Sequence, residues 1–127
     1  MNHCKKIENM AIFMRRKILE ISYRSSHAAH LGGGLSMVEI MATLYAHILN
    51  FDKVNPYWSE RDRFILSKGH GVLGYYSALL AVGFIDEKKY NTYLTNESDL
   101  ISHPIMNLDI GIESSNGSLG QGLSMAI

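Results

Sequence analysis

The stretch RFILSKGHGVLGYYSALLAVG, residues 63–83, changes its hydrophobic pattern at its centre. Residues 63–67 form a compact apolar run that is typical of a short strand. The apolar run after the glycines is long enough for a helix, and Gly83 suits the position just past a helix end. We therefore predict a strand, a glycine–histidine turn and a helix in direct succession, an order that fits an α/β protein.

The turn between these two elements contains the first candidate for chemistry, His70, which stands between two glycines. In an open α/β sheet, ligands bind beyond the carboxyl ends of the strands, so His70 is well placed to donate to a phosphate. A buried histidine that is hydrogen-bonded to the backbone explains the motif equally well. Lys68 precedes it, but the P-loop pattern G-x-x-x-x-G-K-[ST] does not occur, so nucleotide hydrolysis of the usual kind is unsupported.

Two helices are predicted upstream of this turn. Apolar residues recur at three- and four-residue spacing over about 4–23, which indicates an amphipathic helix. Ser36 and Glu39 have the S-x-x-E spacing of a capping box, and an apolar stripe follows them. We therefore expect a second helix to begin directly after the glycines at 32–34.

A glycine run lies between those helices, in HAAHLGGGLSM, residues 27–37. It is either a flexible connection or an anion site, because successive glycines let the backbone approach a ligand and a helix start offers free N–H groups. His27 and His30 together supply at most two of the four ligands that zinc normally takes, so a metal clip is the weaker interpretation.

The downstream part is predicted to be mostly loop. Asp86 can cap a short helix that runs to about Leu94, and Pro104 holds His103 towards an extended conformation. His103 can exchange protons near neutral pH or hydrogen-bond a hydroxyl, although an exposed loop histidine is the commoner case. GSLGQG, residues 117–122, is a glycine turn that enters another helix, and the chain stops inside it. The sequence therefore looks cut off.

Composition narrows the class of protein. The chain has 127 residues, enough for one domain, with 46% hydrophobic and 19% charged residues. Twelve acidic side chains balance twelve basic ones, which argues against a nucleic-acid binder. There is one cysteine, no signal-peptide core and no apolar run of membrane-spanning length, so we expect a cytoplasmic protein with no membrane contact.

Taken in order, the motifs HAAHLGGGLSM (27–37), NPYWSERDRFILSKGH (55–70), SHP (102–104) and GSLGQG (117–122) resemble the N-terminal part of a transketolase. The resemblance covers almost the whole chain. It implies an α/β thiamine diphosphate-binding domain with a parallel sheet, of which residues 1–127 are a helix-rich and incomplete first part. It also implies transfer of a two-carbon ketol unit from a ketose phosphate to an aldose phosphate, as in the pentose phosphate pathway.

The resemblance assigns roles to individual residues. His30 matches a catalytic histidine that contacts substrate and assists proton transfer, and His103 matches a second catalytic histidine near the transferred hydroxyl groups. His70 matches a histidine that contacts thiamine diphosphate, and Gly117, Ser118 and Leu119 match a backbone segment that touches the same cofactor. Two positions depart from the family: Leu31 stands where many relatives have proline, and Asn116 where threonine is usual.

The same resemblance indicates what this chain does not contain. The G-D-G…N segment that ligates Mg²⁺ or another divalent cation, the glutamate that activates the cofactor and the second cofactor-facing domain would all lie beyond Ile127. No metal ligand is therefore assigned here, and the chain alone is expected to be inactive. Its expected partners are sugar phosphates and the remainder of the enzyme or a C-terminal subunit, in a homodimer or a heterotetramer.

Two alternatives remain open at this point. A fragment of a deoxyxylulose phosphate synthase belongs to the same superfamily, but its N-terminal region departs more from the run RDRFILSKGH, residues 61–70. A non-catalytic remnant that acts only as an interaction module would keep the fold and lose the chemistry.

Overall fold

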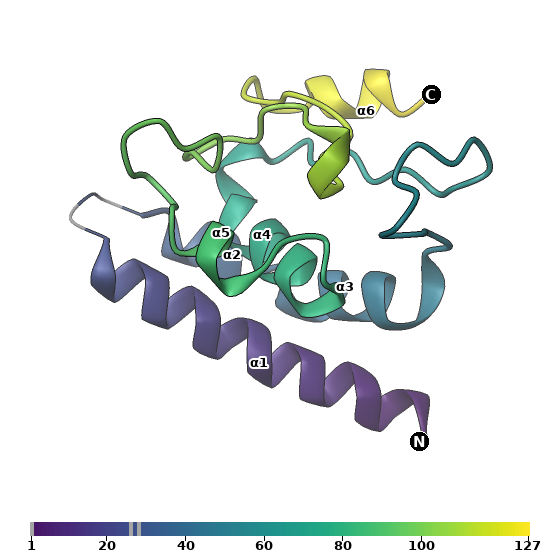
Figure 1. Cartoon of the computed structure of the whole chain (residues 1–127), viewed down its shortest axis with the longest axis horizontal. Helices are drawn as coiled ribbons and strands as arrows, with labels where there is room; N and C mark the ends of the chain where they lie inside the picture. The colour runs from purple at the N-terminus through teal and green to yellow at the C-terminus, as the bar shows by residue number, and fades with distance from the viewer. Residues whose placement is uncertain (1, 26, 28) are drawn as a thin grey trace.

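Helix α4 (Val72–Val82) lies at the centre of the molecule (Figure 1), and residues 72–80 are all buried. A helix that is apolar all round belongs in a core. The buried Ser77 hydroxyl has a hydrogen-bond partner within the helix, because it donates to the Gly74 carbonyl at 3.0 Å.

The computed structural model describes residues 2–25, 27 and 29–127. In this part the elements follow in the order α1 (His3–Arg24), α2 (Leu31–Leu35), α3 (Val38–Thr43), the π-helical turn η1 (Leu44–Ile48), the 3-10 turn η2 (Gly69–Gly71), α4, α5 (Glu87–Tyr90), the 3-10 turn η3 (Leu108–Ile110) and α6 (Gln121–Met125).

Helix α1 packs against α3 and α4 through its apolar stripe. Met14 and Ile18 are fully buried, and the charged residues lie mainly on the outer side. The Asn2 side chain caps the helix by accepting from the Cys4 amide at 3.1 Å. The predicted helix over 4–23 is therefore confirmed to within one residue at each end.

The glycine run is itself helical, which corrects the predicted helix start. Helix α2 contains the glycines, and Ser36 ends it, while α3 begins after Met37 without a side-chain cap. The Ser36 hydroxyl donates to the Gly33 carbonyl at 3.1 Å instead of capping α3. The capping-box prediction is therefore wrong, because α2 already occupies the turn that a cap would need.

Helices α2 and α4 touch through backbone. A Cβ atom added at Gly34 would lie 2.8 Å from Leu73 Cβ, and one added at Gly74 would lie 2.8 Å from the Gly34 carbonyl oxygen. Both distances are shorter than real Cβ contacts allow. Glycine at both positions therefore permits this close crossing.

The predicted strand over 63–67 does not form. The part of the chain that the structure describes contains no strand, only an isolated antiparallel bridge between Asn107 and Ile112. Without a neighbouring strand, the apolar run packs as irregular backbone, with Leu66 buried and the Phe64 ring 5.1 Å from the Tyr75 ring. The helix-rich character is confirmed, and the parallel sheet stays a prediction.

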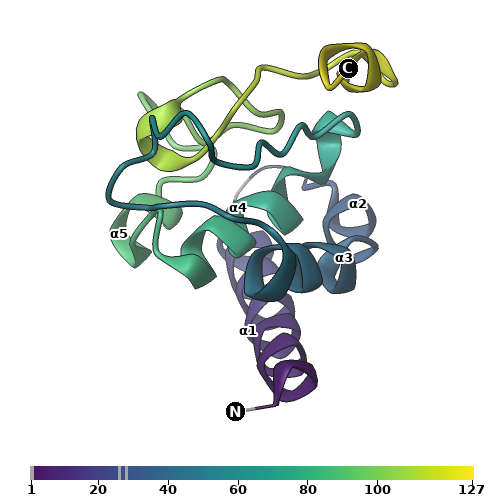
Figure 2. The ribbon, with the colours of Figure 1, turned by 90° about the vertical axis from the view of Figure 1, so that its right-hand side faces the viewer.

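The irregular segments are attached to α4 by two tyrosines. The Tyr75 hydroxyl donates to the Gly111 carbonyl at 2.8 Å, and the Tyr76 hydroxyl donates to the Ile101 carbonyl at 3.0 Å. Burial raises the pKa of the Tyr76 hydroxyl above its ordinary value, so it keeps its proton as a donor. Figures 1 and 2 place these segments and α6 on one side of α4, with α1 on the other.

Two sequence predictions on helix ends are confirmed in this region. Gly83 ends α4 in the left-handed conformation, with φ of 84°. Asp86 caps α5 by accepting from the Lys89 amide at 2.7 Å, although that helix ends at Tyr90, four residues before the predicted end.

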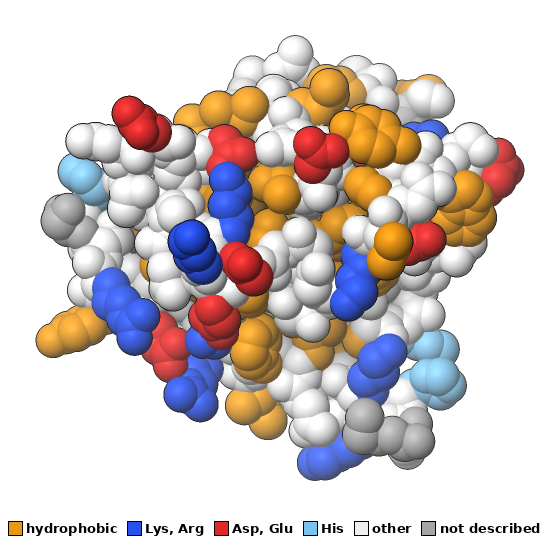
Figure 3. All heavy atoms as spheres, in the orientation of Figure 1, with side chains coloured by type: hydrophobic (Ala, Val, Ile, Leu, Met, Phe, Trp, Pro, Cys, Tyr) orange, Lys and Arg blue, Asp and Glu red, His pale blue; other side chains and the backbone are white. Residues whose placement is uncertain are grey.

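The surface carries charges of both signs. On the face shown in Figure 3, acidic and basic side chains are interspersed and not separated by sign. Lys17 illustrates this, since its ammonium pairs with Glu87 at 2.7 Å and with Glu20 at 3.3 Å. Among the described helices, none has both the length and the apolar character needed to cross a membrane.

The tyrosine contacts lead to a test with a matched control. We expect Tyr76→Phe to lower the free energy of unfolding by about 1–2 kcal/mol, because the Ile101 carbonyl loses its donor. Tyr90→Phe should leave it unchanged or raise it, because the buried Tyr90 hydroxyl has no hydrogen-bond partner among the described residues. Urea denaturation followed by circular dichroism measures both, and equal losses would contradict the assignment.

Candidate functional site

Three histidines from distant parts of the sequence converge on one place. The His30 ring centroid lies 5.5 Å from that of His70 and 6.0 Å from that of His103, with both pairs near edge-on. His30 directly precedes α2, His70 lies in η2 just before α4, and His103 lies in the loop before Pro104. The sequence resemblance named all three, and the fold brings them together.

Glycines allow this convergence by removing side chains at the contacts. A Cβ atom at Gly33 would lie 2.9 Å from His70 Cδ2. One at Gly69 would lie 2.6 Å from the Asn116 carbonyl oxygen and 2.9 Å from His103 Cδ2. The two glycines therefore set how closely α2, η2 and the loop that carries His103 approach one another.

The segment Gly117–Leu119 leaves the cluster at this same point. Asn116 is buried, and its backbone N–H donates to the Pro104 carbonyl at 3.2 Å. The Ser114 hydroxyl donates to the side-chain oxygen of Asn116. Gly117, Ser118 and Leu119 themselves are exposed. Beyond them, Gly122 packs on Ser67, where an added Cβ would lie 2.6 Å from the Ser67 Cα. The exposed segment is therefore anchored at both ends beside the turn that carries His70.

A lysine that the sequence motifs left without a role stands next to the cluster. Lys68 Nζ donates to the Ser36 hydroxyl at 2.8 Å, and that hydroxyl donates to the Gly33 carbonyl. The chain of two hydrogen bonds ties η2 to α2 on the side where Gly33 meets His70. The sequence offered one signal for a role of Lys68, its position shortly before His70. The contact with Ser36 could not be predicted, because the two residues are 32 positions apart.

The polar groups of the cluster suit an anion. Within the described residues, the rings of His30 and His70 have no hydrogen-bond partner, and His103 Nδ1 lies 3.3 Å from the Ser102 hydroxyl. Imidazole N–H groups, glycine backbone and the nearby ammonium of Lys68 are donors that a phosphate can use. No group of three histidine, cysteine or acidic side chains in the described part is placed to hold a metal ion.

A large groove lies elsewhere on the molecule. This groove of about 690 Å³ runs between α1 and the C-terminal end of α4, and none of the three histidines lines it. Size alone would point to that groove as the active site. The convergence of titratable side chains identifies the histidine cluster instead, because chemistry needs such groups within reach of one another.

Comparisons with known proteins agree with the motifs. The family model described as transketolase, thiamine diphosphate binding domain, matches residues 9–127. An apulose-4-phosphate transketolase subunit from Actinobacillus succinogenes is 40% identical over 122 residues, which are 96% of this chain and 44% of that protein. The 6-deoxy-6-sulfo-D-fructose transketolase subunit SqwG of a Clostridium species is 43% identical over 98 residues, 77% of this chain and 36% of that protein.

A solved structure agrees with the fold as well. The transketolase from Leishmania mexicana superposes with a TM-score of 0.81 at 26% identity, over 93% of this chain and 18% of that one. The chain belongs to the transketolase family, and residues 9–127 match its thiamine diphosphate-binding domain as an N-terminal part. It spans less than half the length of the curated relatives described above.

The packing around Gly69 provides the test of this geometry. We expect Gly69→Ala to cost about 1–3 kcal/mol of unfolding free energy and to shift the imidazole C–H signals of His103, because the new methyl group collides with both Asn116 and His103. Gly117→Ala is the control, since nothing lies within 4 Å of its Cβ position. Two-dimensional NMR of the histidine rings and chemical denaturation check both variants. Unchanged His103 signals in Gly69→Ala would contradict the described cluster.

Proposed function

We propose that this chain supplies the N-terminal part of the active site of a transketolase, which moves a two-carbon ketol unit from a ketose phosphate to an aldose phosphate. The observation that carries the proposal is the convergence of His30, His70 and His103, with ring centroids 5.5 and 6.0 Å apart. The names of two relatives, both transketolase subunits, support this activity over that of a deoxyxylulose phosphate synthase. They also weigh against a purely structural remnant.

In this proposal, the exposed glycine segment and one histidine receive the cofactor. His70 donates to the diphosphate, and the backbone of Gly117, Ser118 and Leu119 lies against the same molecule. Lys68 adds a positive charge near the phosphates and holds α2 in place through Ser36. Thiamine diphosphate, when bound, supplies the stabilisation of the carbanion at the transferred carbons.

The two remaining histidines act on the substrate. His30 is exposed and precedes α2, so its ring can contact a sugar phosphate and assist proton transfer at the reacting carbons. His103 is half-buried and holds or moves a proton at the transferred hydroxyl groups. The Ser102 hydroxyl lies beside His103 Nδ1, and the direction of the hydrogen bond between them sets which ring nitrogen carries the proton.

The residues assigned above account for only part of the proposed site. The proposal includes Mg²⁺ or another divalent cation and assigns none of its ligands to residues 1–127. Relatives whose names describe them as transketolase subunits support a second, partner polypeptide, in a heterotetramer or, for a single long chain, a homodimer. The protein would work in the cytoplasm on sugar phosphates, in pentose phosphate metabolism.

A chimera tests the assigned roles. Residues 1–127 replace the matching segment of the Actinobacillus succinogenes relative, and two-carbon transfer is measured in the assembled enzyme. We expect His30→Ala and His103→Ala to lower kcat about a hundredfold, and His70→Ala to raise the half-saturating thiamine diphosphate concentration at least tenfold.

His47→Ala is the control for that experiment. His47 is exposed on η1, and its ring contacts that of His3 at a centroid separation of 4.1 Å and not those of the three clustered histidines. Its removal should leave kcat unchanged. Full activity in the three cluster variants would exclude their residues from the site.

The chain by itself gives the complementary result. Calorimetric titration with thiamine diphosphate and Mg²⁺ should show no binding in the micromolar range, because the proposed metal ligands are outside it. Micromolar affinity would mean that residues 1–127 already hold the cofactor, and the division of the site proposed above would be wrong.

A further inference from the structure

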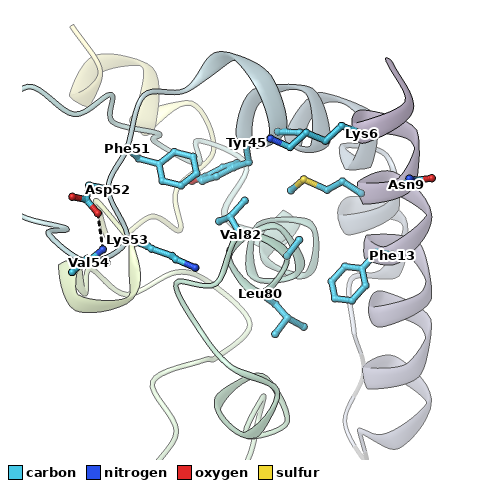
Figure 4. Close-up of a pocket in the computed structure, with 13 residues that line it drawn as sticks. Lys6, Asn9, Phe13, Tyr45, Phe51, Asp52, Lys53, Val54, Leu80 and Val82 are labelled. Carbon is cyan, nitrogen blue, oxygen red and sulfur yellow. Dashed lines mark hydrogen bonds between the residues drawn. The ribbon is translucent and has the colours of Figure 1, made fainter. Parts of the chain in front are cut away.

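The groove between α1 and α4 has features that the transketolase site does not use. Its volume of about 690 Å³ lies within the range of small-molecule sites, which is roughly 300–1,000 Å³. It is lined by Met10 and Phe13 of α1, Tyr45 of η1, Phe51 of the following loop, and Leu80 and Val82 of α4. These side chains give it an apolar floor and walls, as Figure 4 shows.

Two lysines reach into this apolar space. Figure 4 shows Lys6 extending from α1 towards Tyr45, and Lys53 extending from the loop towards Val82. Lys53 Nζ lies over the end of α4, only 2.9 Å from the position of a Cβ at Gly83. The partial negative charge at a helix C-terminus holds an ammonium in such a position.

The charge of the groove is positive on balance. Neither Lys6 nor Lys53 pairs with a carboxylate among the described residues. The one acidic residue in the lining is Asp52, whose carboxylate accepts from the Val54 amide at 2.8 Å and lies at the outer edge of the loop in Figure 4. An apolar floor with two such ammonium groups is complementary to a molecule with an apolar body and an anionic head.

We propose that this groove is a binding site for a small amphipathic organic anion, an apolar body that carries a carboxylate, sulfonate or phosphate. The groove and the histidine cluster lie at opposite ends of α4, because the groove contacts residues 80–82 and His70 lies just before residue 72. The anion site is therefore separate from the proposed catalytic site and does not depend on it.

The test uses decanoate as the probe and the methyl groups of Leu80 and Val82 as reporters. Titration followed by methyl NMR of the 127-residue chain should give saturable shifts of these signals and leave the ring signals of His30, His70 and His103 in place. Decyltrimethylammonium, with the same alkyl chain and the opposite charge, should bind at least tenfold more weakly. Equal affinity for the two probes, or no saturable shift with decanoate, overturns the proposal.

Variants locate the anionic head. Lys6→Gln and Lys53→Gln should each weaken decanoate binding at least threefold, and Asn9→Glu should do the same by placing a carboxylate in the lining. Lys5→Gln is the matched control, because Lys5 neighbours Lys6 on α1 but pairs with Glu8 outside the groove. Equal weakening in Lys5→Gln overturns the proposal.

A second copy of the chain is the competing occupant. Sedimentation of the chain with and without decanoate separates the two cases. A monomer that binds decanoate supports the anion site. A dimer whose Leu80 and Val82 signals do not respond to decanoate assigns the groove to self-association instead, and overturns the proposal.

Discussion

The contact on which the rest of the structure depends is the close crossing of α2 and α4. Gly34 and Gly74 bring the two backbones within a distance that no side chain at either position would allow. This crossing places the start of α2, with His30, next to η2, with His70. The third histidine then joins through Gly69, which the loop around His103 and Asn116 contacts directly. A core made of larger residues at these points would be as apolar, but it would separate the three imidazoles.

Much of the fold follows from local sequence signals. The period of the apolar residues located α1, and Gly83 and Asp86 marked a helix end and a helix start because each acts through its own backbone neighbourhood. The errors have non-local causes. Ser36 has the spacing of a cap, yet its hydroxyl is taken by Gly33 and by Lys68, 32 residues away. Residues 63–67 have the composition of a strand, and only a neighbouring strand could make them one.

The candidate site was predictable in its members and not in its geometry. Glycine and histidine beside helix starts pointed to His30 and His70 as residues, but their separation along the chain carries no information on distance in space. The family resemblance supplied that link, and the comparisons confirm the family through the match over residues 9–127. Lys68 was rejected as a P-loop lysine, and its hydrogen bond to Ser36 shows a different use of the same charge. The glycine runs indicated close backbone approach, but the partners of Gly33 and Gly69 could not be foreseen, because those partners lie more than 30 residues away in the sequence.

The burial of residues 72–80 of α4 has a consequence for how the chain folds. These residues present no polar side to water, so an isolated α4 would expose apolar surface in every direction and gain nothing from forming early. It becomes stable only when α1, α2 and the loops held by Tyr75 and Tyr76 cover it together. We therefore expect acquisition of structure to be cooperative, with contacts between residues far apart in sequence setting the rate. Local melting of residues 72–80 would expose this apolar surface to water, so we expect the adjoining turn that carries His70 to open only together with the core.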